Sequence, residues 1–259
     1  MFGASTPDPY IFAELPGYNP GNRNLTGKAQ RSPRPETVGV LICAGQSNIC
    51  NTIDTAYFPI NAAKIDNLNV YSGGLYAGAD PLLGCSNMSS RVGNTMTRLA
   101  DKLITAGKYG RVILVTVGMG STTVGMWASS LYPRIVVAHR RCLAVGLTPS
   151  AVLWHQGEND TTAGTSEASY QASLSSIIST VRAAGVSAKW VVAQASYIGG
   201  VTSSAVLAAQ AAVVDGSTIF AGPNTDVVGS AGRVDNTHFN SSGADTVAGL
   251  WTAAIAGAL

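Results

Sequence analysis

The sequence predicts an α/β protein built as a three-layer αβα sandwich, with a central parallel sheet covered by helices on both faces. Two observations indicate this. Apolar runs of strand length alternate with longer segments whose apolar residues recur at helical spacing. The chain also has 259 residues, of which 46% are hydrophobic, so it can bury a sizeable core in one domain.

Residues 1–37 do not share this alternation. They hold six of the eleven prolines and show no periodic apolar pattern, so we expect an irregular N-terminal arm followed by one domain over residues 38–259. No basic segment followed by an apolar core is visible at the start of the chain, and hence no signal peptide. No apolar run reaches the about 18 residues that a membrane-spanning helix needs.

The predicted strands are short apolar runs. The first, over residues 38–44, is apolar throughout, as expected of a strand that is buried on both faces. The run at 68–71 is a weaker candidate. The predicted strands, in order, are 38–44, 68–71, 111–117, 151–154, 189–193 and 218–221.

The predicted helices lie between these strands. Val92, Met96, Leu99 and Leu103 recur at helical spacing and predict the first helix. Gly185 ends the third, and Asn240 or Ser241 is the expected N-cap of the last. The predicted helices are 92–104, 131–145, 166–184, 205–214 and 241–259.

Charge and cysteine content exclude several classes of function. Lysine and arginine are scattered, with no run longer than Arg140 and Arg141, which argues against a nucleic-acid partner and against a polybasic membrane anchor. The four cysteines form neither a Cys-x-x-Cys pair nor a ligand cluster with histidine, so no metal site is expected. Cys43 falls in a core strand, whereas Cys50 and Cys85 either pair or stay free.

Parallel sheets bind ligands at the carboxyl ends of their strands, so the residues that follow each strand are candidates for chemistry. Ser47 follows the first strand, and a glycine-rich stretch that contains Gly120 follows another. The polar stretch 155–160 follows a third strand. Asp235 and His238 precede the final helix, and an aspartate three residues before a histidine can reach its Nδ1.

Each of these signals has an ordinary structural explanation when it is taken alone: a turn, a capping network or a structural histidine. Their joint position at one edge of the sheet is the set of parts that nucleophilic acyl transfer requires. A dinucleotide site is disfavoured, because the glycine spacing is wrong and no acidic residue occurs between 102 and 157. The Gly-x-Ser-x-Gly elbow of α/β-hydrolases is absent from the chain.

Four motifs resemble the SGNH hydrolase superfamily, and within it the carbohydrate acetylesterases that include sialate O-acetylesterases and acetylxylan esterases. The resemblance covers about residues 38–257 and implies a flavodoxin-like αβα fold. The motifs are Gly-Gln-Ser-Asn at 45–48, a glycine-rich stretch ending in Trp at 120–127, Trp-x-Gln-Gly-Glu at 154–158 and Asp-x-x-His at 235–238.

The resemblance implies a serine esterase that removes acetyl or another short acyl group from a carbohydrate. Ser47 would be the nucleophile, His238 the general base and Asp235 the residue that orients His238. The implied oxyanion hole consists of the backbone N–H groups of Ser47 and Gly120 and the side chain of Gln156, with Asn159 as its competitor. The family usually has Gly-Gly-Thr where this chain has Gly120-Ser121-Thr122.

Further expectations concern the substrate. We expect Gln46, Trp127 and Glu158 to contact it. Trp127 and Tyr76 would stack on a sugar ring, with core packing as the open alternative for both. The partner would be an acetylated carbohydrate, and no cofactor would be needed. By analogy with the family, the protein would act outside the cell or in the cell envelope.

Two other functions fit the same sequence. The first is a lipase or thioesterase that uses the same triad on longer acyl chains. The second is a non-catalytic carbohydrate-binding module of a surface or phage tail assembly. The presence of Ser47, His238 and Asp235 together argues against the binding module, whereas the lipase or thioesterase stays open because it would use the same triad.

Overall fold

A computed structural model of the chain describes residues 28–30, 37–86 and 90–259. The expected arm over residues 1–37 therefore lies outside the described residues, apart from 28–30 and 37. In the part that is described, Gln30 forms an antiparallel bridge with Tyr76, and the Lys28 ammonium donates to the carbonyls of Ala79 and Pro81.

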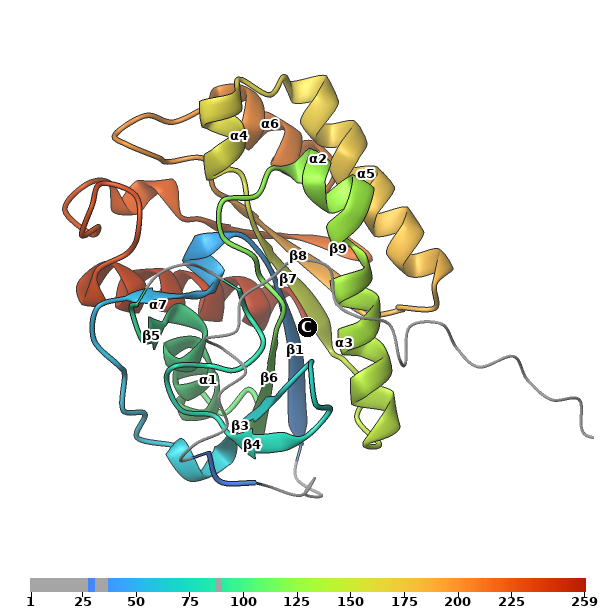
Figure 1. Ribbon diagram of the computed structural model, residues 1–259, viewed down its shortest axis with the longest axis vertical. Helices are drawn as coiled ribbons and strands as arrows, with labels where there is room; N and C mark the ends of the chain where they lie inside the picture. Colours follow the sequence, from blue (N-terminus) through green and yellow to red (C-terminus); the bar gives the residue numbers. More distant parts are fainter. Residues whose placement is uncertain (1–27, 31–36, 87–89) are drawn as a thin grey trace, which may run out of the picture.

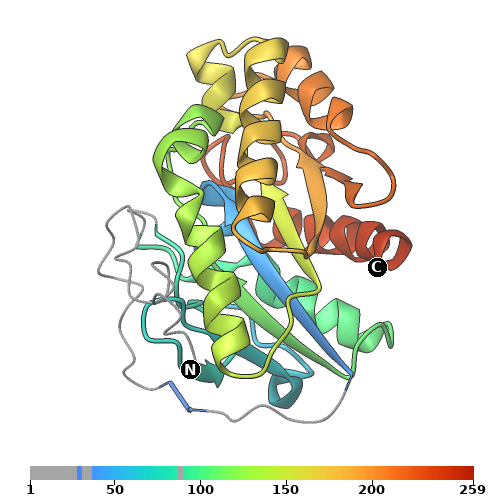
Figure 2. The same ribbon diagram turned by 90° about the vertical axis from the view of Figure 1, so that its right-hand side faces the viewer.

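The chain folds into the three layers that the alternation predicts, and Figures 1 and 2 show the sheet between its helices. The central sheet has seven strands in the order β4-β3-β6-β1-β7-β8-β9, all parallel except the edge strand β4. Its strands are β1 (Val38–Gly45), β3 (Ile65–Leu68), β4 (Leu75–Ala77), β6 (Arg111–Thr116), β7 (Ala151–His155), β8 (Lys189–Gln194) and β9 (Ile219–Asn224).

A two-stranded ribbon of β2 (Asn51–Ile53) and β5 (Gly93–Asn94) lies beside this sheet. The helices are α1 (Thr95–Thr105), α2 (Val124–Met126), α3 (Pro133–Ala144), α4 (Glu158–Ala163), α5 (Glu167–Ala183), α6 (Ser204–Ala212) and α7 (Ser241–Ala258). Short 3₁₀ helices are η2 (Ser47–Ile49), η3 (Ala62–Lys64) and η5 (Asp226–Val228), and η4 (Trp127–Leu131) is a π-helical segment. No helix in the described ranges is long and apolar enough to cross a membrane.

Both faces of β1 are buried, and its side chains alternate between two cores. Val40 and Ile42 pack with α3, α5 and α6, whereas Leu41 and Cys43 pack with α1 and α7. A strand with helices on both faces therefore reads as a continuous apolar run, which is why β1 was predictable.

The second predicted strand is wrong in position. The structure has β3 at Ile65–Leu68, three residues before the expected run at 68–71. The strand contains two buried polar residues, Asp66 and Asn67, which a search for apolar runs passes over. Asp66 pairs with Arg111 at 2.6 Å, and Asn67 hydrogen-bonds the backbone of Leu83.

The helix ends follow from local capping. Asn94, Ser166, Ser203 and Asn240 each accept a backbone N–H from the first turn of the helix that follows. Side chains of this type satisfy N–H groups that otherwise lack a partner. Of the two expected caps of α7, Asn240 is the one observed.

Candidate active site

The carboxyl end of β1 places Ser47 at the edge of the sheet. Gly45 has a φ of +138°, and a Cβ there would lie 1.9 Å from the carbonyl oxygen of His155. Only glycine fits such a close approach of two backbones. The N–H of Gln46 donates to that same carbonyl at 3.0 Å. The chain then turns into η2, with Ser47 as its first residue.

A hydrogen-bonded chain joins Ser47 to the loop before α7. His238 Nε2 lies 3.0 Å from Ser47 Oγ, and His238 Nδ1 lies 2.8 Å from Asp235 Oδ2. The backbone N–H of His238 also donates to Asp235 Oδ1 at 2.7 Å. The three predicted side chains are thus brought together, in the order that base-assisted attack by a serine needs.

Hydrogen bonds keep Asp235 ionised. Its partial burial would raise the pKa of the carboxyl, but the hydrogen bonds from the backbone and ring of His238 and from Arg91 outweigh that effect. They hold the pKa of Asp235 well below its usual range. A carboxylate that stays charged keeps the proton of His238 on Nδ1 and leaves Nε2 free to accept one.

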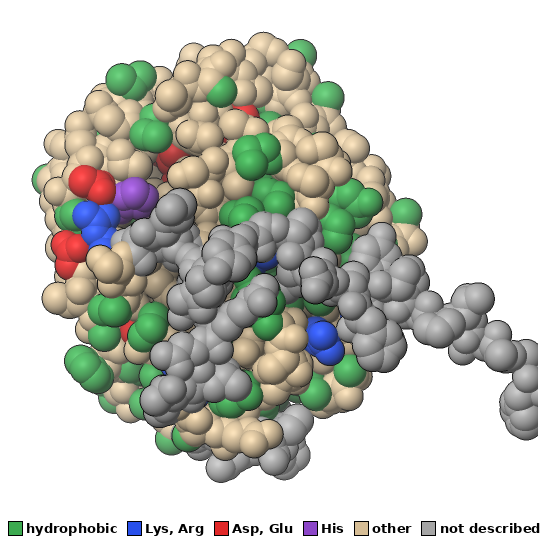
Figure 3. All heavy atoms as spheres, in the orientation of Figure 1, with side chains coloured by type: hydrophobic (Ala, Val, Ile, Leu, Met, Phe, Trp, Pro, Cys, Tyr) green, Lys and Arg blue, Asp and Glu red, His purple; other side chains and the backbone are tan. Residues whose placement is uncertain are grey.

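The triad is accessible at the surface. Ser47 itself is only 7% exposed, whereas the side chains of His238 and Asp235 are 25% and 39% exposed. Figure 3 shows histidine, acidic and basic atoms together at one place on a face that otherwise carries few charges.

Residues from the other two motifs lie beside Ser47 in a buried network. Gln46 Oε1 accepts hydrogen bonds from the Gln156 side chain and from the backbone N–H groups of Gly157 and Asn159. Gln46 is 2% exposed, so the expectation that it contacts the substrate is not met in this structure. Its hydrogen bonds instead hold residues 156–159 next to η2, the short helix that begins with Ser47.

Gln156 has no donor left for an oxyanion. Its Nε2 donates to Thr122 O at 2.9 Å and to Asp160 Oδ2 at 2.6 Å, and the residue is fully buried. Asn159 is partly exposed, and its Nδ2 donates to Ser121 O at 3.3 Å. An amide has two N–H groups, so Asn159 retains one that can reach a ligand. Of the two competitors, the geometry favours Asn159.

The glycine-rich motif also differs from expectation. The backbone N–H of Gly120 donates to Ser86 O at 2.7 Å, so it is not available to an oxyanion. Ser121 follows with a φ of +59°, in the left-handed region. Within the described part of the chain, no hydrogen bond of the Ser121 N–H is found. Ser121 therefore replaces Gly120 as the candidate donor.

Two further substrate contacts are corrected. Trp127 is 0% exposed; its Nε1 donates to Thr122 Oγ1 and its ring packs edge-on against Trp154 with centroids 5.3 Å apart, so it cannot stack on a sugar. Glu158 is 1% exposed and accepts from Asn48 Nδ2 at 2.8 Å. Both belong to the core under the site. Tyr76 lies on β4, which β3 and β6 separate from β1.

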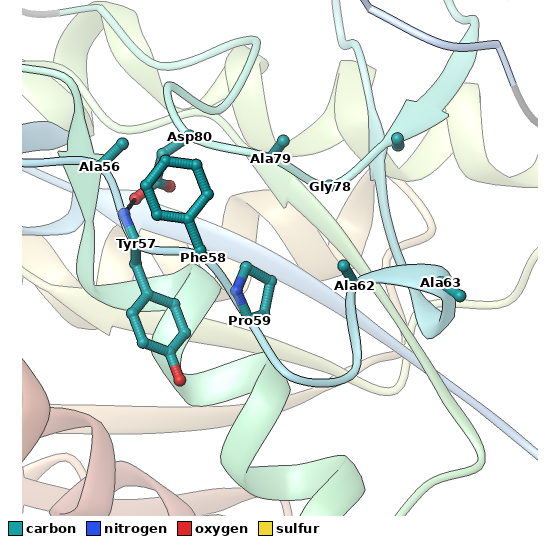
Figure 4. A pocket seen from close by; sticks show the side chains of 10 residues that line it. Ala56, Tyr57, Phe58, Pro59, Ala62, Ala63, Gly78, Ala79 and Asp80 are labelled. Carbon is teal, nitrogen blue, oxygen red and sulfur yellow. Dashed lines mark hydrogen bonds between the residues drawn. The ribbon is translucent and has the colours of Figure 1, made fainter.

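Two cavities among the described residues are lined in part by the loop 56–63. One of them, of about 460 Å³, is completed by residues 77–80. Figure 4 shows Tyr57, Phe58 and Pro59 along it, with Asp80 accepting the N–H of Tyr57. None of its lining residues belongs to the four motifs. Among the described residues, no group of three or more histidine, cysteine or acidic side chains is placed to hold a metal ion.

Sequence reasoning missed several residues that contact the triad or its loop, and Arg91 and Asn48 are two of them. Arg91 donates to Asp235 at 2.9 Å, and nothing in its own segment marks it. Asn48 donates to Thr237 O and accepts from the N–H of Phe239, which ties the nucleophile turn to the histidine loop. Its place in the Gly-Gln-Ser-Asn motif was a signal that could have pointed to it.

Comparisons with known proteins bear on the family and on the fold. A model of the family described as carbohydrate esterase, sialic acid-specific acetylesterase, matches residues 37–256. A search of curated proteins found no match. Several solved structures have a similar fold.

Three of these structures illustrate the similarity. A protein of Arabidopsis thaliana has a TM-score of 0.65 at 18% identity, with 86% of this chain and 98% of that chain covered. A carbohydrate acetylesterase from Xanthomonas citri has a TM-score of 0.61 at 15% identity, with 85% and 56% covered. NanS has a TM-score of 0.57 at 17% identity, with 86% and 97% covered.

Proposed function

Because the chain belongs to the sialic acid-specific acetylesterase family of carbohydrate esterases, we propose that it hydrolyses O-acetyl esters of carbohydrates with a Ser47–His238–Asp235 triad. The family makes the chain a carboxylic ester hydrolase that acts on acetylated sugars. The observation that supports the assignment of roles is the chain of two hydrogen bonds, 3.0 Å and 2.8 Å long, from Ser47 Oγ through the ring of His238 to Asp235.

The first half of the reaction acylates Ser47. Its Oγ forms a bond to the acetyl carbonyl carbon while its proton moves to His238 Nε2. The carbonyl oxygen becomes an oxyanion. Collapse of this intermediate breaks the bond to the sugar oxygen, which leaves with the proton from Nε2, and the acetyl group remains on Ser47.

The second half returns the enzyme to its starting state. A water molecule gives its proton to His238 Nε2 and attacks the acetyl carbon. The bond to Ser47 Oγ then breaks and Oγ recovers the proton from Nε2. Acetic acid leaves and gives its own proton to the solvent to become acetate. Asp235 keeps its negative charge throughout and stabilises the imidazolium in both halves.

We assign the oxyanion hole to three donors: the backbone N–H groups of Ser47 and Ser121 and the Nδ2 of Asn159. Ser47 begins the turn η2, where the first N–H groups have no partner within the turn. Asn159 and Ser121 are held together by their own hydrogen bond. A donor that is fixed before the reaction needs no reorganisation when charge develops.

The test is acetate release from acetylxylan and from O-acetylated sialic acid, together with p-nitrophenyl esters of increasing acyl length. We expect the wild type to release acetate and to prefer the acetyl ester. Ser47→Ala should reduce kcat by at least about 10³-fold while the protein stays folded. Full activity of Ser47→Ala would exclude this nucleophile. A preference for long acyl chains would favour a lipase or thioesterase, and an inactive wild type would favour a binding module.

A further inference from the structure

The carboxylate of Asp235 is shared between His238 and an arginine. Its Oδ2 lies 2.8 Å from His238 Nδ1 and 2.9 Å from Arg91 Nη1. Its Oδ1 accepts the backbone N–H groups of Thr237 and His238. Four donors therefore fix the carboxylate, and Arg91 is the one among them that comes from outside the loop 235–238.

Arg91 is itself held in place. Its Nε lies 2.7 Å from Asp54 Oδ1, and its Nη1 also approaches Thr52 O at 3.5 Å. The neighbouring Val92 donates its N–H to Ile53 O, next to the pairing of β2 with β5. Arg91 thus sits on a ribbon whose strand β2 begins two residues after the turn that carries Ser47.

This arrangement connects the two halves of the triad. Ser47 begins η2, which leads into β2, and Arg91 lies just before β5, the partner strand of β2. Asp235 and His238 lie on the loop before α7. The Arg91–Asp235 ion pair bridges the two across 144 residues of sequence. Its members are 22% and 39% exposed, so it adds little to stability, since such pairs contribute about 0–1 kcal/mol. Its effect is on position and on local charge.

We propose that Arg91 is a positioning residue for the proposed esterase reaction: it aims Asp235 Oδ2 at His238, and its charge, partly balanced by Asp54, acts on the imidazole through that carboxylate. The proposal rests on the proposed function. A cation on the far side of Asp235 disfavours a second positive charge on the imidazole, and the carboxylate of Asp54 opposes that cation.

Other ionisable groups also lie near His238, and the variants proposed below leave them unchanged. Arg233 donates to Thr237 O, and the Asn48 amide links the same carbonyl to the buried Glu158. His155 packs edge-on against Phe239, the residue after His238. Tyr197 donates its hydroxyl to Asn236 in the loop. The ionisable and charged groups found at the loop among the described residues are Asp235, Arg91, Asp54, Arg233, Glu158, His155 and Tyr197.

The experiment follows the titration of the His238 ring by NMR of histidine-labelled protein. The chain has three histidines, and the His238 signal is assigned by its loss in His238→Asn. Arg91→Met removes the cation and keeps the aliphatic stem, so the titration midpoint should rise by about 0.5 to 1 pH unit. Asp54→Asn removes the opposing anion and should lower it by about 0.3 to 0.5 pH unit.

Kinetics supply a second readout. The acidic limb of the kcat/KM profile should move in the same direction as the midpoint in each variant, because only the neutral imidazole accepts the Ser47 proton. Arg91→Lys keeps the charge but loses the planar fork that bonds both carboxylates. It should leave the midpoint near that of the wild type and lower kcat about 3- to 10-fold, with KM little changed.

The opposite signs separate this role from a merely structural one. The proposal would be overturned if the midpoint of the His238 titration did not change in Arg91→Met. It would also be overturned if the midpoint moved in the same direction in Arg91→Met and Asp54→Asn. If Arg91→Met does not fold, Asp54→Asn and Arg91→Lys still decide it. If the wild type cleaves no acetyl ester, the proposed function fails, while the titration, which needs no substrate, still reports on Arg91.

Discussion

The side-chain amide of Asn48 donates a 2.8 Å hydrogen bond to Oε1 of Glu158, a carboxyl that is 1% exposed. Burial raises the pKa of Glu158 to about 7, although the bond from Asn48 acts in the opposite direction. The same amide also donates to Thr237 O in the histidine loop. Glu158 therefore supports the site through Asn48 rather than by touching the substrate.

Glu158→Gln should change how stability depends on pH. The pKa of Glu158 is about 7 in the folded protein and 4.5 for an ordinary glutamate. Between these values the unfolded chain has lost the proton and the folded one keeps it, so the wild type loses stability as pH rises from 4.5 to 7. Relative to the wild type, the variant should gain roughly 3 kcal/mol in unfolding free energy over that range. Urea unfolding at stepped pH measures this.

His155→Gln is the control of opposite sign. Burial lowers the pKa of His155 to about 4, from 6.5 for an ordinary histidine, and the nearby Arg233 adds to this effect. The wild type therefore gains stability from this residue as pH rises from 4 to 6.5. Relative to the wild type, the variant should lose stability over that range. Curves for both variants that run parallel to the wild-type curve would contradict the assigned protonation states.

Asn159→Ala should reduce kcat by about 10² to 10³-fold with little change in KM, because an oxyanion donor acts mainly in the transition state. Gln156→Met should differ. It leaves the hydrogen-bonding groups of Asp160 and Gln46 without their partner, so the unfolding free energy should fall by about 2 kcal/mol. Steady-state kinetics and urea unfolding of both variants measure this. A large kcat loss in Gln156→Met at unchanged stability would return the donor role to Gln156.

Trp127→Ala should lower the unfolding free energy by about 3 to 5 kcal/mol, since the side chain is fully buried against Trp154. The milder Trp127→Phe loses the bond to Thr122 and should cost about 1 kcal/mol. Because the indole lies in the core, KM for an acetylated carbohydrate should stay near the wild-type value in Trp127→Phe. A several-fold rise in KM at unchanged stability would restore Trp127 as a substrate contact.

The layers and most strands were predictable because burial on both faces leaves a direct mark on composition. The apolar run of β1 is an example. The meeting of Ser47 with His238 and Asp235 also followed, since residues after parallel strands converge at one edge and Asp-x-x-His spans a single loop. The strand β3 was misplaced because Asp66 is buried through its partner Arg111, and pairing of that kind leaves no pattern in the strand itself.

The same limit applies to the surroundings of the triad. Gln46 and Glu158 are polar residues in a motif, and sequence alone does not tell a polar side chain that binds a ligand from one that satisfies buried groups. Arg91 was out of reach for another reason. Its contact with Asp235 depends on how the β2–β5 ribbon lies against the loop before α7, which is a property of the folded chain.

Gly45→Ala tests whether the close approach of β1 and β7 holds the nucleophile in place. The added Cβ would lie 1.9 Å from the carbonyl oxygen of His155, on a backbone with φ of +138°. The backbone of β1 or β7 would have to move to relieve this clash, and Ser47 would move with it. We therefore expect a loss of about 3 kcal/mol in unfolding free energy. We also expect kcat to fall at least about 10-fold, because a small displacement of the nucleophile is enough to slow the reaction.

Gly249→Ala is the matched control. Gly249 lies within α7, and a Cβ there meets nothing within 4 Å. Alanine is the better helix former, so this variant should gain up to about 1 kcal/mol and keep its kcat. Thermal unfolding and acetate release are measured on both. If Gly45→Ala were as stable and as active as Gly249→Ala, the sheet would have room at this point, and the position of Ser47 would depend on the Gln46 and Asn48 side chains instead.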